Sequence, residues 1–353
     1  MTEIDASEHG SGRRRRPGTL KTVGLTLAAA LVLGAAAAGW AAYRHLDGNI
    51  TSVDIDTALG DDRPARAVNA PVPYGAASPA PLPAGPLNIL VLGSDSRGGT
   101  ENRELGGGDS TGARSDTAMV VHVDAGRRSA TIVSIPRDTL VTRPSCPLSS
   151  GGSTSKARGV MFNTAYSVGG PVCAVKTVES LTGVRMDHYV EVDFSGFAKL
   201  VNALGGVTVT TTEDIDDEDS HLTLAAGVHH LDGVQALALA RTRHGMGDGS
   251  DLGRIGLQQT LVKALLEQIA STDLFTSPTR LYEVADAATR SLTTDTGLDS
   301  LSELTELARS LKSLSAAQVT TVMMPVRPAP SDPNRVIARN PEASDLWKSL
   351  HRP

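Results

Sequence analysis

The chain has 353 residues, of which 40% are apolar and only 3% are aromatic, and its net charge is −6. This length suits one α/β domain with extensions, or two small domains. Residues 1–21 carry a net charge of +2, which leaves −8 for the remainder. Nucleic acid rewards a positively charged surface, so the composition argues against a nucleic-acid partner.

The first predicted element is a membrane-spanning helix over residues 22–43. Residues 22–42 carry no charged side chain, and about 20 apolar residues cross a bilayer core. The four arginines 13–16 and Lys21 precede this run, so the positive-inside rule predicts a cytoplasmic tail over 1–21. The result is a single-pass type II protein of the cell membrane. A cleaved signal peptide is the alternative, because the Ala-rich end of the run is a possible cleavage site.

A linker is predicted between this helix and the folded domain. Residues 44–86 are expected to form an extracytoplasmic juxtamembrane segment followed by a Pro/Ala-rich spacer. Seven prolines lie within 64–86, which is typical of an extended chain. The catalytic domain is then predicted over 87–325, with 326–353 as a C-terminal extension.

Strands and helices are expected to alternate from residue 87 onward. Apolar and β-branched runs predict strands at 87–92, 117–123, 130–135, 188–192, 207–212 and 319–324. Longer periodic segments predict helices at 171–182, 194–204, 233–240, 252–271, 279–291 and 298–313. This interleaving predicts an α/β fold.

Two cysteines, Cys146 and Cys173, are present. Outside the membrane they would meet an oxidising compartment, which favours a disulfide between them. Two buried thiols are the alternative. No spacing of Cys and His suggests zinc, and the pair His229 and His230 is expected in a structural loop.

Arginines and carboxylates recur at the ends of the predicted elements. They lie within 93–97, 114–117, 136–138, 240–243 and 251–258. A planar guanidinium group binds two phosphate oxygens at once, and carboxylates bind divalent metals. On a helix, Asp251, Arg254 and Gln258 share one face. In an extended segment, Arg241 and Arg243 would point the same way. The pattern indicates a site for a pyrophosphate ester and its metal, with ordinary surface ion pairs as the alternative.

The segments that carry these residues resemble the LytR-CpsA-Psr family. They are NILVLGSDSR (88–97), RSDTAMVVHV (114–123), ATIVSIPRDTLV (130–141), FNTAYSVGGP (162–171), VESLTGVRMDHYVEVDFSGFAKLVNALGGV (178–207), LDGVQALALARTR (231–243) and DLGRIGLQQ (251–259). The resemblance implies a central mixed or mostly antiparallel sheet with helices on both faces and an apolar pocket for a prenyl tail. It also implies a phosphotransferase that moves a glycopolymer from a polyprenyl-pyrophosphate carrier to the primary hydroxyl of N-acetylmuramic acid in peptidoglycan.

The resemblance further implies roles for individual residues. Asp95 and Asp116 match the aspartates that bind Mg²⁺ (or Mn²⁺), and either is a candidate base. The other catalytic positions are Arg114, Arg137, Arg241, Arg243, Asp251 and Arg254, and the substrate-binding positions are Arg97, Asn163 and Gln258. Met161 and Leu257 stand where members often have Lys and Arg. Met161 removes one cation, so the preferred polymer or the rate is expected to differ, whereas Leu257 is expected to be a packing residue.

Two other functions fit the same site. If water replaces the sugar hydroxyl, the protein is a pyrophosphatase that acts on polyprenyl-pyrophosphate lipids. If no reaction follows binding, it is a lipid-binding regulator of the envelope. An acidic domain outside the membrane fits the regulator poorly.

Overall fold

The computed structural model describes residues 19–66, 85–94, 115–242, 251–272 and 277–350, without the side chains of 19–29, 116, 251 and 252. The chain divides into two compact units, Met1–His45 and Leu46–Pro353. Helix α1 (Thr19–Asp47) includes the predicted span 22–43. In the part of the chain that the structure describes, no helix combines the length and apolarity needed to cross a membrane. The membrane span therefore stays a prediction.

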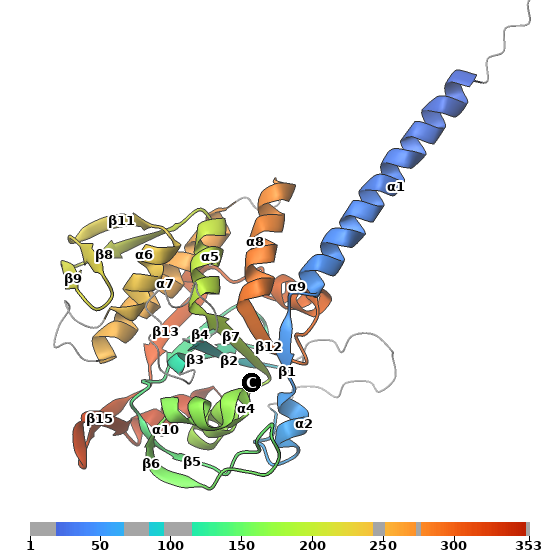
Figure 1. Ribbon diagram of the computed structural model, residues 1–353. Coiled ribbons are helices and arrows are strands. Elements are labelled where there is room, and N and C mark those ends of the chain that lie inside the picture. Colours follow the sequence, from blue (N-terminus) through green and yellow to red (C-terminus); the bar gives the residue numbers. More distant parts are fainter. Residues whose placement is uncertain (1–18, 67–84, 95–114, 243–250, 273–276, 351–353) are drawn as a thin grey trace, which may run out of the picture. The chain divides into compact units, whose positions relative to one another are not determined.

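A seven-stranded sheet forms the centre of the second unit (Figure 1). Its order is β1-β12-β7-β2-β3-β4-β13, with parallel pairs β1–β12, β7–β2 and β4–β13 and antiparallel pairs elsewhere. The strands are β1 (Thr51–Val53), β2 (Leu87–Ser94), β3 (Ser115–Val123), β4 (Ala130–Ser134), β7 (His188–Asp193), β12 (Leu292–Asp295) and β13 (Val319–Met323). This mixed sheet confirms the predicted fold class.

The helices of this unit agree with the predicted ones to within a few residues, with one exception. They are α4 (Asn163–Thr182), α5 (Phe194–Ala203), α6 (Gly233–Arg241), α7 (Asp251–Ser271), α8 (Pro278–Ser291) and α9 (Leu301–Ser310), with α2 (Ile55–Leu59) and α10 (Glu342–Ser349) in addition. The exception is α4, which begins at Asn163 rather than at 171. Gly169 and Gly170 have non-helical backbone angles and Pro171 follows them, so the helical pattern is interrupted at a kink.

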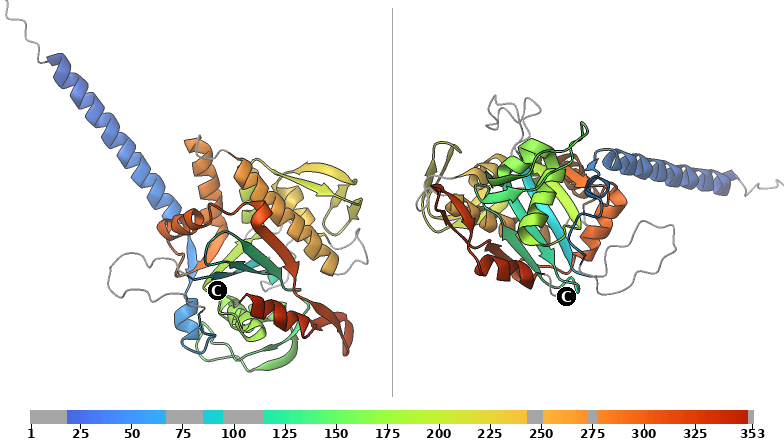
Figure 2. Two further views of the ribbon diagram at one scale, coloured as in Figure 1. Left: turned by 180° about the vertical axis from the view of Figure 1, so that it is seen from behind. Right: turned by 90° about the horizontal axis from the view of Figure 1, so that it is seen from below.

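Alternate side chains of the central strands enter two different hydrophobic cores. Leu90 and Val120 pack with α2, α4 and α10, whereas Ile89 and Val121 pack with α7 and α9. Helices therefore cover both faces of the sheet, as predicted (Figure 2). Because both faces of β2 are buried, its residues 89–92 form a continuous apolar run rather than an alternating pattern.

Short antiparallel strand pairs lie outside the central sheet. They are β5 (Leu140–Arg143) with β6 (Ala157–Met161), β8 (Val207–Thr211) with β11 (Gly227–Leu231), β9 (Ile215–Asp217) with β10 (Leu222–Leu224), and β14 (Val326–Ala329) with β15 (Asp332–Ala338). The loop predicted at His229 and His230 is wrong, because both residues pair with β8 as part of β11. A further hydrophobic core contains side chains of the four strands β8, β9, β10 and β11 and of the helices α5, α6 and α7.

The predicted start of the domain at residue 87 is wrong. Strand β1 forms an edge of the central sheet beside β12. Ile55 and Leu59 of α2 are buried in the core that contains α4. The apolar residues of this segment belong to a strand and a helix of only a few residues, which are stabilised by tertiary contacts rather than by local propensity.

The predicted C-terminal extension is also wrong, because 326–350 belongs to the folded unit. Ala343 and Trp347 of α10 are buried in the same core as α2 and α4. The hairpin of β14 and β15 contacts the rest of the fold through Arg335, which forms an ion pair with Asp138 at 3.2 Å.

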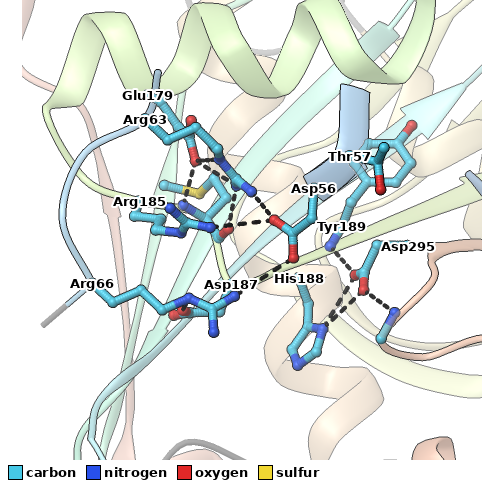
Figure 3. Close-up of polar contacts among 12 residues, drawn as sticks. Asp56, Thr57, Arg63, Arg66, Glu179, Arg185, Asp187, His188, Tyr189 and Asp295 are labelled. Atoms are coloured by element: carbon cyan, nitrogen blue, oxygen red, sulfur yellow. Dashed lines mark hydrogen bonds and ion pairs between the residues drawn. The ribbon is translucent and has the colours of Figure 1, made fainter. Parts of the chain in front are cut away.

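A buried ion pair fastens the segment after α2 to α4 (Figure 3). The side chains of Arg63 and Glu179 are only 1% and 3% exposed, and Arg63 Nη2 lies 2.7 Å from Glu179 Oε1. The same nitrogen donates to the carbonyl oxygen of Met186 at 2.7 Å, and Asp56 also pairs with Arg63. This network fixes residues 56–63 against the sheet.

Two buried acidic groups lie along β7 and just before it. Asp187 accepts a hydrogen bond from the backbone N–H of Asn88 at 2.9 Å, and burial raises the pKa of its carboxyl above the usual range. Glu191 accepts hydrogen bonds from the hydroxyls of Tyr166 and Tyr189 at 2.7 and 2.6 Å. Burial, together with the Glu191 carboxylate, raises the pKa of Tyr189 well above its usual value.

Cys146 and Cys173 form a disulfide. The bond joins the segment after β5 to α4, and both residues are buried. The predicted pairing is therefore confirmed.

Candidate active site

A cavity of about 250 Å³ lies where β3 begins and β7 ends. Its lining consists of Thr117, Phe194, Asp219, Ala240, Arg241, Arg254 and Gln258. Three of these residues, Arg241, Arg254 and Gln258, belong to the predicted site, so the structure brings this part of the set together. A wall with two guanidinium groups suits an anionic ligand with phosphate-like geometry.

Helix α7 contributes Arg254 and Gln258, which are four residues apart and therefore share a face. Both side chains are buried, with 3% and 6% exposed. Gln258 Nε2 donates to Thr117 Oγ1 at 3.0 Å and to the carbonyl oxygen of Ala240 at 2.9 Å. Gln258 therefore holds β3 and α6 together at the cavity. The helix begins at Asp251, as predicted.

Arg241 is the last residue of α6 and lies over the ring of Phe194. Its guanidinium carbon is 5.5 Å from the ring centroid, a cation–π contact that orients the side chain. The extended arrangement predicted for Arg241 and Arg243 is wrong for Arg241, because the helix continues to this residue. The backbone N–H of Thr242 still donates to the carbonyl oxygen of Ala238 at 2.9 Å.

Close glycine contacts fix the position of α5 beside the cavity. Gly196 lies against Ser291 of α8, and Gly233 of α6 lies against the backbone of Ala198. A Cβ atom at either glycine would overlap its neighbour. Helix α5 therefore holds Phe194 at a set distance from both α6 and α8.

Asp219 is a lining carboxylate that sequence reasoning missed. It lies in the turn between β9 and β10, next to Ser220. Ser220 donates its backbone N–H to Asp217 Oδ1 at 3.0 Å, and its hydroxyl lies 3.0 Å from Thr242 Oγ1. The sequence signal is an acidic run, EDIDDED over 213–219, in which no spacing singles out Asp219. The hydrogen bond between Ser220 and Thr242 holds this turn against the end of α6, next to the cavity.

Arg137 and Asn163 form a second group beside the end of β4. The backbone N–H of Asn163 donates to the carbonyl oxygen of Arg137 at 3.1 Å, and Arg137 Nε lies 3.8 Å from Asp138 Oδ2. Asn163 is buried, and its Oδ1 accepts no hydrogen bond from the described residues. Neither residue is among the described lining of the cavity.

Strands β2 and β3 meet at this same end of the sheet, next to the segments of the sequence that contain other predicted residues. Ser94 at the end of β2 pairs with Ser115 at the start of β3. The N–H of Ile135 donates to the carbonyl oxygen of Ala118, which brings Arg137 beside the start of β3. Asp95, Arg97, Arg114 and Arg243 lie outside the described residues, and Asp116 and Asp251 are described without their side chains.

The metal site stays a prediction. Within the described ranges, no group of three or more His, Cys, Asp or Glu side chains could hold a metal ion, and the proposed ligands Asp95 and Asp116 are not among the side chains searched. Among the described lining residues, the oxygen donors that carry no positive charge include the carboxylate of Asp219 and the hydroxyl of Thr117. Such oxygen donors are the kind that Mg²⁺ prefers.

The two departures from the family pattern have different surroundings. Leu257 is 7% exposed and packs in the core of β8, α5, α6 and α7, which confirms that it is a packing residue. Met161 is half-buried at the end of β6, close in sequence to Asn163. The structure offers no account of what Met161 changes.

This fold and cavity define a mixed α/β protein with an arginine-lined cavity. The chain belongs to the LytR_cpsA_psr family, whose model matches residues 42–352. The family predicted from the sequence is thus confirmed, and the match reaches beyond both ends of the predicted catalytic domain.

Individual relatives and one solved structure agree with this assignment. The chain is 34% identical over 268 residues to the cell wall biosynthesis protein LcpA of Corynebacterium glutamicum, covering 69% of this chain and 50% of that protein. It is 32% identical over 241 residues to the polyisoprenyl-teichoic acid–peptidoglycan teichoic acid transferase TagU of Halalkalibacterium halodurans, covering 67% and 69%. A LytR-Csp2A-Psr enzyme from Actinomyces oris shares the fold, with a TM-score of 0.61 at 24% identity over 86% and 96% of the two chains. The chain spans about half the length of its corynebacterial relative.

Proposed function

We propose that this protein is a phosphotransferase that moves a glycopolymer from a polyprenyl-pyrophosphate carrier to peptidoglycan. The observation that carries the proposal is the convergence of Arg241 and Arg254 on one cavity, where Gln258 ties two of the walls together. The printed functions of the relatives LcpA and TagU, cell wall biosynthesis and teichoic acid transfer to peptidoglycan, support the same reaction class.

The two arginines bind the pyrophosphate of the carrier. Arg254 is almost fully buried, so its charge is weakly screened and its interaction with phosphate oxygens is strong. The ring of Phe194 orients Arg241 before the substrate arrives, which reduces the entropy lost on binding. Gln258 is already bonded to the wall, so its role is to position β3 and α6.

The reaction replaces the bridging anhydride oxygen of the pyrophosphate with the ester oxygen of the acceptor hydroxyl. The primary hydroxyl of N-acetylmuramic acid attacks the phosphorus that bears the glycopolymer, and the bond from this phosphorus to the bridging oxygen breaks. Polyprenyl phosphate leaves, and the polymer is joined to peptidoglycan through a phosphodiester. Negative charge on the phosphate oxygens is stabilised by the two guanidinium groups. Asp95, Asp116 and Asp219 are the carboxylates available to accept the hydroxyl proton.

Asp95 and Asp116 would hold Mg²⁺ (or Mn²⁺), which would neutralise part of the pyrophosphate charge. The reaction requires contact with a lipid carrier and with the cell wall. The protein is therefore placed in the cell membrane as a single-pass type II protein with residues 44–353 outside, and no nucleic-acid partner is involved. The charge-free run 22–42 and the cations before it support this topology. The apolar pocket for the prenyl tail is part of the same proposal.

The experiment uses the purified full chain with a polyprenyl-pyrophosphate oligosaccharide, Mg²⁺ and nascent glycan strands. Arg241→Ala and Arg254→Ala should each lose about 2–4 kcal/mol of transition-state stabilisation, or roughly 30- to 1,000-fold in transfer rate. Arg309→Ala, at an exposed arginine of α9, is the matched control and should keep the wild-type rate. Thermal melting separates lost chemistry from lost folding.

The same assay distinguishes the alternatives. Release of phosphate without transfer to glycan would favour a pyrophosphatase, and carrier binding without turnover would favour a non-catalytic regulator. Wild-type transfer by both arginine variants would contradict the proposal outright. Asp95→Ala and Asp116→Ala should abolish Mg²⁺ dependence of transfer and also weaken Mn²⁺ binding measured by electron paramagnetic resonance.

A further inference from the structure

A second cavity, of about 320 Å³, lies between α5 and α8. The start of α5 is a wall of both cavities: Phe194 lines the first, whereas Asp193 and Ser195 line the second. A volume of roughly 300–1,000 Å³ is typical of sites for small ligands. The second cavity is thus large enough for a ligand of its own and adjoins the proposed reaction site.

Regular helical spacing builds the walls of this groove. On α8, Tyr282, Asp286 and Arg290 recur every four residues and so share a face. On α5, Ser195 and Lys199 have the same spacing. The groove between these two faces, here called the α5/α8 groove, is lined along its length by side chains with hydrogen-bonding groups.

The charged side chains of the α5/α8 groove sum to −1, whereas the described ones of the arginine-lined cavity sum to +1. Lys199 and Arg290 accompany the carboxylates of Asp193, Glu283 and Asp286. Arg290 Nε lies 3.0 Å from both carboxylate oxygens of Asp286, so this pair largely cancels. A pyrophosphate gains little here, whereas a neutral ligand with many hydroxyls can donate to the carboxylates and accept from the cations.

Tyr282 adds the other feature that such a ligand requires. Its side chain lines the groove and remains 39% exposed. An aromatic ring with one apolar face and a polar hydroxyl packs against the C–H face of a pyranose and bonds its hydroxyls. The combination of a ring, balanced charges and hydroxyl groups is the chemistry that recognises sugars.

We propose that the α5/α8 groove binds an oligosaccharide of N-acetylated hexosamines during transfer. The inference rests on the proposed function in placing the reacting phosphate in the neighbouring cavity, and it deepens that function by adding a saccharide subsite. Two sources supply such sugars: the peptidoglycan strand that accepts the polymer, and the first sugars of the polymer on its carrier. Both share the chemistry that the groove recognises.

Calorimetry on the full chain in detergent separates the two sources with three probes. The first is a soluble N-acetylglucosamine–N-acetylmuramic acid tetrasaccharide whose lactyl carboxyl groups are amidated and therefore uncharged, the second a farnesyl pyrophosphate bearing a disaccharide, and the third farnesyl pyrophosphate alone. Tyr282→Ala should weaken binding of a sugar-bearing probe about ten-fold and leave farnesyl pyrophosphate unchanged. Lys199→Ala, at an exposed residue, tests the same groove without removing the ring.

Leu281→Ala is the matched control, because Leu281 is equally exposed at 39% on the same helix but does not line the groove. It should bind every probe as the wild type does. Weaker binding of the tetrasaccharide by Tyr282→Ala identifies the acceptor strand as the occupant. Weaker binding of the sugar-bearing pyrophosphate alone identifies the polymer's own sugars.

Unchanged affinity of both sugar-bearing probes in Tyr282→Ala and Lys199→Ala would overturn the groove proposal. Failure of the proposed function gives a different result. In that case Arg254→Ala would retain farnesyl pyrophosphate binding, while the effect of Tyr282→Ala on the sugar probes would remain.

Discussion

Replacing Arg63 with alanine should destabilise the folded unit far more than replacing Arg66, although both belong to one charged cluster. Arg63 is 1% exposed and donates through Nε and Nη2 to Glu179 at 2.7–3.1 Å. Arg66 is 44% exposed, and its pairs with Asp56 and Asp187 are 3.6 and 3.5 Å long. The two variants therefore compare a fully buried arginine that forms short ion pairs with a partly exposed one whose ion pairs are longer.

The expected magnitude follows from what remains after each substitution. Without Arg63, the Glu179 carboxylate stays buried and keeps the hydrogen bond from the backbone N–H of Met186 at 2.9 Å. Breaking one side of a buried ion pair costs about 3–5 kcal/mol. Removing an exposed partner costs about 0–1 kcal/mol. The difference between the two unfolding free energies should be roughly 2–5 kcal/mol.

Urea unfolding followed by tryptophan fluorescence measures this difference. Trp347 is buried in the same core as Ile55 and Leu59, so its emission reports the packing of α2. The chain has two tryptophans, and a Trp40→Phe background leaves Trp347 as the single probe.

A second substitution tests the physical cause. If the orphaned charge of Glu179 is responsible, Arg63→Ala combined with Glu179→Gln should recover part of the lost free energy. Equal losses in Arg63→Ala and Arg66→Ala, or no recovery in the double variant, would refute the reasoning.

The disulfide, buried glutamine and buried aspartate give further expectations. Cys146→Ser should lower the unfolding free energy by about 3 kcal/mol, because the bond to Cys173 closes a loop with a sequence separation of 27. Gln258→Leu should weaken binding of farnesyl pyrophosphate about ten-fold, since Thr117 loses the hydrogen bond that orders the cavity wall. The raised folded-state pKa of Asp187 means that its charged form costs stability above that pKa. Asp187→Asn should therefore stabilise the protein near pH 7, and this advantage should vanish as the pH falls through the folded pKa.

Each of these expectations has its own control. A reducing agent should remove the difference between wild type and Cys146→Ser, and a persistent difference would point to packing. Gln259→Leu, the next residue of α7, should leave farnesyl pyrophosphate binding nearly unchanged; equal losses at both positions would argue against a specific role for Gln258. For Asp187→Asn, urea unfolding from pH 4 to pH 8 supplies the test, and an advantage that persists at pH 4 would contradict the assigned cause.

Regular patterns in the sequence predicted five of the seven strands of the central sheet, most of the helices and part of the site. The run of β2 is apolar on both faces, so its strand needed no knowledge of its neighbours. Arg254 and Gln258 were matched by the four-residue spacing that any helix imposes. Arg137 was predicted beside them; its carbonyl oxygen accepts the backbone N–H of Asn163 at the end of β4, and neither residue is among the described lining of the cavity.

Features that depend on distant contacts escaped the sequence. Strand β1 and helix α2 are too short for a periodic signal, and they exist because β12 and α4 offer partners. Nothing in the acidic run of the sequence distinguishes Asp219 from its neighbours. The hydrogen bond between Ser220 and Thr242 holds its turn next to the cavity. The first part of α4 was hidden by the kink at Gly169 and Gly170.

The tight seating of α5 limits how the substrate range of this protein can change. Neither Gly196 nor Gly233 has room for a methyl group, so the helix cannot slide to widen one cavity without closing in on the other. These backbone contacts of α5 therefore fix the summed width of the two cavities. A bulkier sugar has to be accommodated by shorter side chains on α8, and a bulkier phosphate ester by shorter ones on α6 or α7. Evolution of specificity is thus directed to side chains on the outer walls, while the shared wall stays fixed.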